Sequence, residues 1–129
     1  MKKFFNSLSN EDKLAFNGSL LYSEPENIVQ RFNIDDVVYC EVFYENEDDI
    51  NKRITFRLAV DKKHRKQYFA TQMIKNVIDF CFSSLAVKEI YIDIKKKNKI
   101  AIKILKKFNF QKDCYLGNQY ERYVLRKDF

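Results

Sequence analysis

The hydrophobic period of this chain changes from that of a strand to that of a helix between residues 60 and 68. Residues 54–60 (ITFRLAV) alternate apolar and polar side chains, as a strand with one buried face does. From residue 68 to 82 the apolar side chains Phe69, Met73, Val77 and Phe80 or Cys81 fall on one helical stripe. Only a basic loop separates the two patterns. A strand that runs almost directly into a helix predicts an α+β domain built around one mixed sheet.

The rest of the second half continues the same patterns. We expect a strand over 88–94, a helix over 98–108, and a closing hairpin whose strands cover 110–116 and 119–126. The pair Gly117-Asn118 predicts the hairpin turn. Asn109 predicts the end of the helix, because asparagine enters the left-handed backbone region more easily than most residues.

The first half predicts two helices and one strand. Ser9-Asn10-Glu11-Asp12 is typical of an N-cap with first-turn acids, for a helix that runs to about Phe16. A second helix is expected over 23–33, with Pro25 in its first turn and Ile28, Val29 and Phe32 on one face. The β-branched and aromatic run 37–44 predicts a strand, which an acidic turn at 45–49 joins to strand 54–60 as an antiparallel hairpin.

Length and composition predict a single domain over residues 1–129. Of these 129 residues, 46% are hydrophobic and only 2 are Gly and 1 is Pro, which favours one packed core over a disordered or linker-rich chain. No apolar run approaches the ~20 residues that span a bilayer. No signal peptide is visible. The cysteines Cys40, Cys81 and Cys114 match neither a disulfide framework nor a metal spacing, so we expect a cytoplasmic protein without a metal.

Charge divides the chain into two unlike halves. Residues 1–50 carry 4 Lys and Arg against 11 Asp and Glu, and the remainder carries 20 against 7. The basic half favours a polyanionic ligand, either a nucleic acid or a phosphorylated cofactor. The acidic half favours a cationic partner. The helix N-terminus at residue 68 adds free backbone amides and a positive dipole end to the loop cations Lys62, Lys63, Arg65 and Lys66, which predicts an anion site there.

Two motifs in this order resemble the GNAT acyl-CoA N-acyltransferases. The first, Val60-x4-Arg65-x2-Tyr68-Phe69-Ala70-Thr71, is similar to the family's pyrophosphate loop, Arg/Gln-x-x-Gly-x-Gly/Ala. The second, Asn98-x2-Ala101-x3-Leu105-x3-Asn109-Phe110, is similar to its Asn-x-x-Ala-x-x-x-Tyr-x-x-x-Gly-Phe helix. The resemblance covers roughly residue 53 to the end. It implies a GNAT-like α+β fold, a mostly antiparallel mixed sheet flanked by about four helices, with a cofactor-binding core over 51–129 and a variable acceptor-side segment over 1–50.

The resemblance also implies a function and a set of contacts. The chain would be an N-acetyltransferase that moves an acetyl group from acetyl-CoA to a primary amine, and many relatives pair as homodimers. The main chain of Leu58, Ala59 and Val60 would pair with the pantetheine arm like an added strand. Asn98 would lie near the thioester. The backbone amides that would hold the pyrophosphate belong to the loop and first helical turn: Arg65, Lys66, Gln67, Tyr68, Phe69, Ala70 and Thr71.

Three positions depart from the family pattern. Tyr68 replaces the loop glycine that lets the backbone approach a phosphate closely. Leu105 replaces a tyrosine that protonates the departing thiolate in many members, and Asn109 replaces a glycine. The first two departures keep open a second hypothesis, a catalytically silent protein with the same fold that acts as a binding or regulatory module.

Acetyl transfer to an amine needs a proton acceptor, and two strand carboxylates are candidates. Glu41 lies within the strand 37–44, and Asp93 lies on the strand that should splay from residues 57–58 to admit the cofactor. His64, the single histidine, lies at the phosphate end among cations, so we expect an exposed loop residue. One of Tyr115, Tyr120 and Tyr123 in the hairpin could replace the general acid that Leu105 cannot supply.

The acceptor and other partners are less defined. Acidic residues in the first half indicate a cationic amine. The lysine run 95–99 and the lysines of the following helix form a basic face that would suit nucleic acid, a third hypothesis. No stacking-aromatic motif or helix-turn-helix accompanies these lysines, so we expect a solvated face or contacts with cofactor phosphates.

Overall fold

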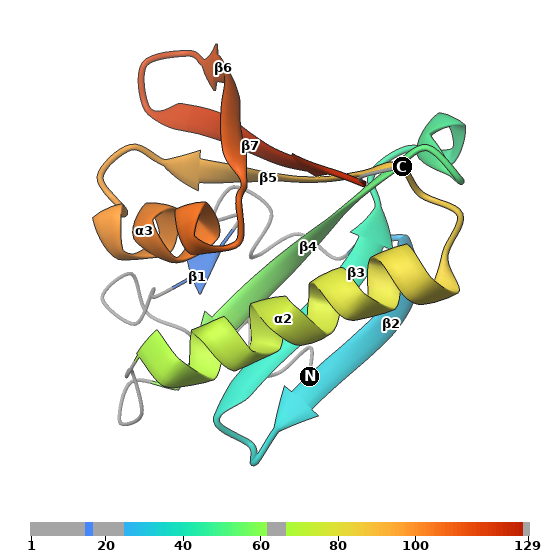
Figure 1. The fold of residues 1–129 in the computed structure, drawn as a ribbon, viewed down its shortest axis with the longest axis horizontal. Coiled ribbons are helices and arrows are strands. Elements are labelled where there is room, and N and C mark those ends of the chain that lie inside the picture. Colours follow the sequence, from blue (N-terminus) through green and yellow to red (C-terminus); the bar gives the residue numbers. More distant parts are fainter. Residues whose placement is uncertain (1–14, 17–24, 62–66, 128–129) are drawn as a thin grey trace.

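A single mixed sheet organises the portion of the chain that the computed structural model describes, which is residues 15–16, 25–61 and 67–127. The sheet has seven strands in the order β2-β3-β4-β5-β7-β6, and β1 pairs with β4 outside this path (Figure 1). The strands are β1 (Ala15–Phe16), β2 (Asn27–Ile34), β3 (Val38–Tyr44), β4 (Arg53–Val60), β5 (Glu89–Lys95), β6 (Gln111–Leu116) and β7 (Tyr120–Arg126). Two α-helices, α2 (Gln67–Ser84) and α3 (Lys99–Lys107), and the 3-10 turn η3 (Glu47–Asp49) complete the described elements.

The expected α+β fold with a mostly antiparallel sheet is confirmed. All neighbouring strands pair antiparallel except β4 and β5, which are parallel. Strand β4 leads into α2 and the chain returns through β5, as a parallel pair requires. The predicted hairpin of β3 with β4 and the closing hairpin of β6 with β7 are both present.

The prediction of a helix over residues 23–33 is wrong, because residues 27–34 form strand β2. This strand pairs with β3 from Asn27↔Tyr44 to Ile34↔Val38, and the register shifts between Ile28 and Gln30. The extra residue of this bulge, Val29, makes apolar positions adjacent and so imitates helical spacing. Pairing along a strand then outweighs the weak helical preference.

The helix expected at the start of the chain is also wrong for those of its residues that the structure describes. Ala15 and Phe16, its last predicted residues, form the short strand β1. Residues 9–14 lie outside the described residues. Among the residues that the structure describes, there are two α-helices where about four were expected, since the segment meant for one of the others supplies a strand to the sheet.

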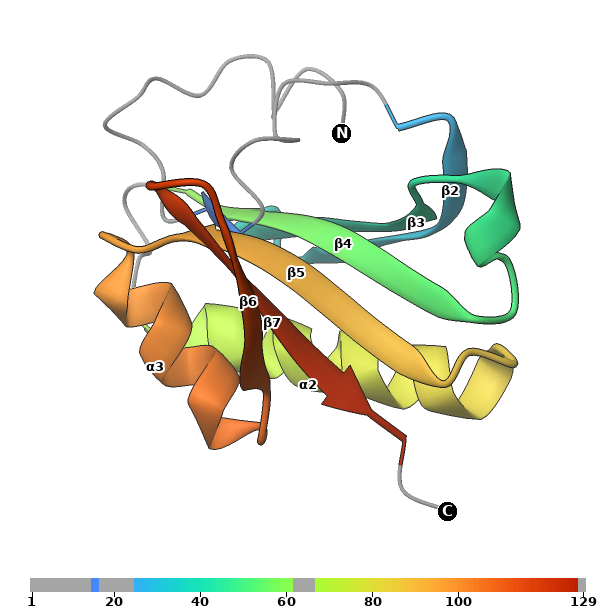
Figure 2. The same cartoon turned by 90° about the horizontal axis from the view of Figure 1, so that it is seen from above.

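Both helices pack on one face of the sheet (Figure 2). That face carries fully buried apolar side chains from the central strands, among them Val42, Phe56 and Ile92, against Met73 of α2 and Ile104 of α3. We call it the helix face. The opposite face carries the polar and charged side chains of the same strands, and we call it the polar face. Alternation along each strand assigns each side chain to one face or the other.

Helix α3 lies where the sequence predicts a helix, over residues 98–108. The side chain of Asn98 accepts a hydrogen bond from the backbone N–H of Ala101 at 3.2 Å and caps α3. Asn109 follows α3 with φ of 68°, the left-handed conformation expected of it. Gly117 has φ of 69° in the turn between β6 and β7. Neither described helix is long and apolar enough to cross a membrane.

Candidate functional site

A V-shaped gap opens between the parallel strands β4 and β5. The two strands pair only at their first residues, Arg53 with Glu89 and Ile54 with Ile90. At the next position Thr55 donates its hydroxyl to the main-chain oxygen of Tyr91 at 2.6 Å, so a side chain takes over where the ladder stops. Beyond this apex the strands diverge toward their carboxyl ends (Figure 1).

The β4 edge that faces this gap contains the three residues predicted to bind pantetheine. Leu58 and Val60 point into the helix-face core, and Ala59 is equally buried on the other face. Strand β1 pairs antiparallel with this edge, Ala15 with Ala59 and Phe16 with Leu58. The main chain at these residues therefore accepts an added strand, and here the chain itself supplies it.

The N-terminus of α2 lies at the open end of the gap, because the helix follows β4 after a short loop. Gln67 is its first residue, and its first turn contains no acidic side chain that would oppose an anion. Tyr68 is 66% exposed and its ring contacts that of Phe69 at 5.3 Å between centroids. Ala70 is buried and Thr71 half-buried. The predicted residues Arg65 and Lys66, and His64, lie outside the described residues.

The N-terminus of α3 lies at the same end. The carboxyl ends of two parallel strands meet at one end of a sheet, so the residues after β5 come near those after β4. Asn98 stands there as the N-cap of α3. Its side chain is committed to the helix amide, and Asn98 has further contacts besides. Two helix N-termini thus flank the open end of the gap.

A row of alternating charges crosses the polar face, one from each of five neighbouring strands. Arg31 lies opposite Glu41, Glu41 opposite Arg57, and on the other side of the gap Asp93 lies opposite Arg122. The parallel register places Arg57 level with Asp93. The row reads Arg31, Glu41, Arg57, gap, Asp93, Arg122, and the two side chains that flank the gap carry opposite charges. We call it the charge row.

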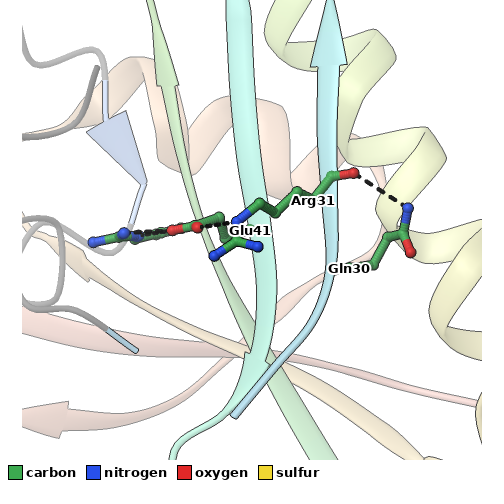
Figure 3. Close-up of polar contacts among 4 residues, drawn as sticks. Gln30, Arg31 and Glu41 are labelled. Atoms are coloured by element: carbon green, nitrogen blue, oxygen red, sulfur yellow. Dashed lines mark hydrogen bonds and ion pairs between the residues drawn. The ribbon is translucent and has the colours of Figure 1, made fainter. Parts of the chain in front are cut away.

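Glu41 is held inside this row by two arginines. Its side chain is 1% exposed, and its Oε1 accepts a hydrogen bond of 2.6 Å from Nε of Arg57, which is 2% exposed. Its Oε2 accepts one of 2.8 Å from Nε of Arg31, which reaches across from β2 (Figure 3). Both carboxylate oxygens of Glu41 are therefore engaged in ion pairs. Beside this network the side-chain amide of Gln30 donates a hydrogen bond to the main-chain oxygen of Arg31 at 3.2 Å.

Asp93 is held by one arginine in a bidentate pair. Arg122 donates from Nε at 2.8 Å and from Nη2 at 3.0 Å to the two oxygens of Asp93, an arrangement that raises the pKa of the guanidinium. The guanidinium also lies 4.5 Å from the ring centre of Tyr91, whose hydroxyl donates to Glu45 at 2.5 Å. Burial, followed by the bond to Glu45, raises the pKa of Tyr91. Asp93 keeps 13% of its side chain exposed and lies on a wall of the gap.

The residues considered as a general acid are placed apart. Leu105 is fully buried in the core and offers no proton. Tyr123 is buried on the helix face and its hydroxyl lies 3.3 Å from Glu121. Tyr115 is 60% exposed between Lys96 and Lys112. Tyr120 lies opposite Lys95 at the open end of the gap.

A mixed α+β sheet with one splayed parallel strand pair and a helix N-terminus beyond each of those strands defines the fold class of this chain. The sequence matches the family model described as acetyltransferase (GNAT) domain over residues 21–111. The match covers more than half of the chain, and the chain belongs to this family. No curated protein matches its sequence.

Solved structures with the same fold are distant in sequence. A chimeric spermidine N-acetyltransferase from Vibrio cholerae and hSSAT aligns with a TM-score of 0.64 at 16% identity. The N-acetyltransferase PseH of Campylobacter jejuni, in complex with acetyl coenzyme A, aligns with 0.63 at 15%. Each alignment covers 74% of this chain and 64% of the other, so the chain spans less than two thirds of their length. At this identity the likeness concerns the fold.

Sequence reasoning missed the three arginines of the charge row. It singled out Glu41 and Asp93 but gave no role to Arg31, Arg57 or Arg122. The signal for Arg57 is present, since a charged residue within an otherwise buried strand calls for a buried partner. The partners themselves depend on strand order and register, which the local pattern does not give.

Proposed function

We propose that this protein is an N-acetyltransferase that moves the acetyl group of acetyl-CoA to a primary amine. The observation that carries the proposal is the gap between β4 and β5, with the edge of Leu58 to Val60 on one wall and a helix N-terminus beyond each strand. Membership in the acetyltransferase (GNAT) domain family supports the cofactor, as does the acetyl coenzyme A complex of the structurally similar PseH.

The described residues fit acetyl-CoA. The main chain of Leu58, Ala59 and Val60 would pair with the amide groups of pantetheine, because this edge already accepts the backbone of β1. The start of α2, from Gln67 through Thr71, would face the pyrophosphate, with the free N–H groups of its first turn as donors. Asn98 would lie beside the inner portion of the cofactor. Since β1 occupies the same edge, acetyl-CoA must displace it, and the cofactor itself supplies the activated acetyl thioester.

The reaction then requires one proton to be taken from the acceptor. An acceptor ammonium gives a proton to Asp93, directly or through water, and its nitrogen attacks the thioester carbonyl carbon. The C–N bond forms, the C–S bond breaks, and coenzyme A leaves as a thiolate that takes up the second proton from nitrogen. Both carboxylates are paired with arginines, and we assign the proton-accepting role to Asp93 rather than Glu41 because Asp93 lies on a wall of the gap with 13% of its side chain exposed, whereas Glu41 lies one strand away and is 1% exposed.

A catalytically silent relative is the second candidate, favoured by Leu105. Its buried side chain stands where a thiolate-protonating hydroxyl is expected and cannot supply one. In that case the protein would bind acetyl-CoA and release no acetylated amine. Tyr120 lies opposite Lys95, two residues nearer the open end than the level of Asp93. Tyr120→Phe tests whether its hydroxyl protonates the thiolate: a lower kcat would give it that role, and an unchanged kcat would leave the amine nitrogen as the proton source.

Calorimetry with acetyl-CoA tests the cofactor first. We expect saturable binding, and Ala15→Pro combined with Phe16→Pro should tighten it because both N–H donors of β1 are removed. Tyr68→Gly should preserve or tighten binding, and Tyr68→Ala controls for the helix-weakening effect of glycine. No detectable binding at millimolar acetyl-CoA, in wild type and in the β1 variant alike, would refute the proposed function. Acetyl transfer to a panel of amines, followed by mass spectrometry, then separates the enzyme from the silent relative.

A further inference from the structure

The charges at the open end of the gap differ between its two walls. On the β5 side there are three consecutive lysines: Lys95 ends the strand, and Lys96 and Lys97 follow it. Together with Asn118 and Gln119 of the β6–β7 turn they line a pocket of about 350 Å³. Every side chain that lines this pocket, among the residues the structure describes, is a cation or an amide. The apolar stems of these side chains form most of the pocket wall, and their ammonium and amide ends offer N–H donors and positive charge to an acidic group.

The pocket has a fixed frame. The backbone N–H of Lys96 donates to the main-chain oxygen of Gln119 at 2.9 Å, which ties the lysine loop to the hairpin turn. The ammonium of Lys96 lies 4.6 Å from the ring centre of Tyr115, and the ammonium of Lys112 lies 4.5 Å from the same ring centre. Lys112 in turn pairs with Glu121, so the nearest carboxylate on β7 is already matched by a cation. The charge that remains at this pocket is positive.

The acids of the first half lie elsewhere in the described fold. Glu45 and the η3 acids Glu47–Asp49 precede β4 and so lie at the closed end of the gap. Asp35 and Asp36 form the turn between β2 and β3; together with Asp61 of the second half, which follows β4, they lie at the open end but on the β4 side. Within the charge row both carboxylates are paired with arginines. The described residues therefore give no acidic surface on the β5 wall that would select a polycation.

Position along β5 gives the spacing between the reacting group and this pocket. The pyrophosphate site at α2 lies at the open end, so the pantetheine arm runs inward and the thioester would lie deeper, level with Asp93. Asp93 and Lys95 lie on the same face, two residues apart, which is about 7 Å along a strand. If the amine of an acceptor lies at Asp93, a group about 7 Å from that amine would lie at the lysine pocket.

We propose that the acceptor is a primary amine that carries an acidic group, phosphate or carboxylate, roughly 7 Å from its nitrogen, and that Lys95, Lys96 and Lys97 bind this group. The inference rests on the proposed function and names the substrate class of the same site. It replaces the cationic amine that the acidic first half indicates, because the fold carries the acids of η3 to the closed end of the gap and places lysines at the open end.

Matched amines test the proposal, with acetyl-CoA as donor and product detected by mass spectrometry. Glucosamine 6-phosphate is compared with glucosamine, 6-aminohexanoate with hexylamine, and spermidine serves as the polycation. We expect kcat/KM for each acidic amine to exceed that of its neutral partner at least tenfold, and the advantage to shrink with added salt. The larger of the two advantages identifies phosphate or carboxylate as the group bound.

Two double variants that each remove two positive charges distinguish binding in the lysine pocket from the effect of the protein's overall positive charge. Lys95→Gln with Lys97→Gln should remove the advantage, whereas Lys75→Gln with Lys88→Gln, both exposed and away from the pocket, should retain it. The pocket variant should leave the Kd of acetyl-CoA within about twofold of wild type. A tenfold weaker Kd with unchanged discrimination would assign the lysines to the cofactor and overturn the proposal. Equal rates for neutral amines, or a preference for spermidine, would overturn the acceptor class alone, and no acetylation of any amine would overturn the proposed enzyme.

Discussion

Replacing Glu41 by Gln should destabilise the fold more than any exposed charge substitution in this chain. The substitution keeps the shape of the side chain but removes its charge. Arg57, whose side chain is 2% exposed, then loses its ion pair with Glu41 while its charge stays buried, and the ion pair of Arg31 with Glu41 is lost as well. Breaking a buried ion pair from one side costs about 3–5 kcal/mol, because the remaining charge stays away from water.

That cost converts into a large shift of the melting temperature. Unfolding entropies near 60 °C are about 2.1 cal/mol/K per residue, which gives roughly 0.27 kcal/mol/K for a chain of this length. A loss of about 3–5 kcal/mol therefore lowers Tm by roughly 11–18 °C. Against a total stability of about 5–15 kcal/mol for ordinary domains, the change is a substantial share.

Thermal and urea unfolding followed by circular dichroism measure the effect. Asp79→Asn is the matched control, because Asp79 pairs with Lys75 at 3.7 Å on the surface and such pairs contribute under about 1 kcal/mol. The double variant Glu41→Leu with Arg57→Met should lose less than Glu41→Gln, since no unmatched charge remains buried. A Glu41→Gln protein within about 1 kcal/mol of wild type would refute the buried-pair argument. Normal stability with abolished acetyl transfer would instead make Glu41 catalytic.

Three further outcomes follow from single contacts. Thr55→Val leaves a main-chain oxygen at the apex of the gap without its hydroxyl donor and should cost about 1–3 kcal/mol, whereas Thr55→Ser should cost less; chemical unfolding measures both. Asn98→Ala should cost about 0.5–2 kcal/mol through loss of the α3 cap, and Asn98→Asp, which still caps, should separate this from any loss of acetyl-CoA affinity. Burial raises the pKa of Cys81 to about 12 and that of Cys40 well above its ordinary value, so a thiol reagent at pH 8 should modify the partly exposed Cys114 first. The other two thiols, almost entirely protonated at this pH, should react only as the protein unfolds, and rapid modification of all three would contradict the described burial.

Local sequence patterns predicted most elements of the second half. The change of period between residues 60 and 68 gave β4 and α2, and Asn109 marked the end of α3, whereas the role of Asn98 as its N-cap came from the structure. These signals are local, because a cap or a period is set by residues within a few positions of one another. The same local rule failed at β2, where one bulge residue, Val29, gave a strand the apolar spacing of a helix.

The burial and the ion pairs of the charge row could not be predicted without the tertiary structure. The sequence singled out Glu41 and Asp93 as candidate proton acceptors, without a means to rank them. Strand order brings Arg31 and Arg57 to both sides of Glu41 and Arg122 to Asp93, so both carboxylates are paired, and of the two it places only Asp93 on a wall of the gap. Partners so distant along the chain leave no periodic signal.

The sequence by itself determined the family-like order of loop, strand and helix, and the positive charge of the second half, because each depends on residues that are neighbours along the chain. Only the tertiary structure decided where those charges meet. It placed the acids of η3 at the closed end of the gap and the lysines 95–97 at its open end, since the parallel register of β4 and β5 fixes which ends coincide. It also placed β1 on the β4 edge predicted for the cofactor. Hydrogen bonding between distant strands sets both results.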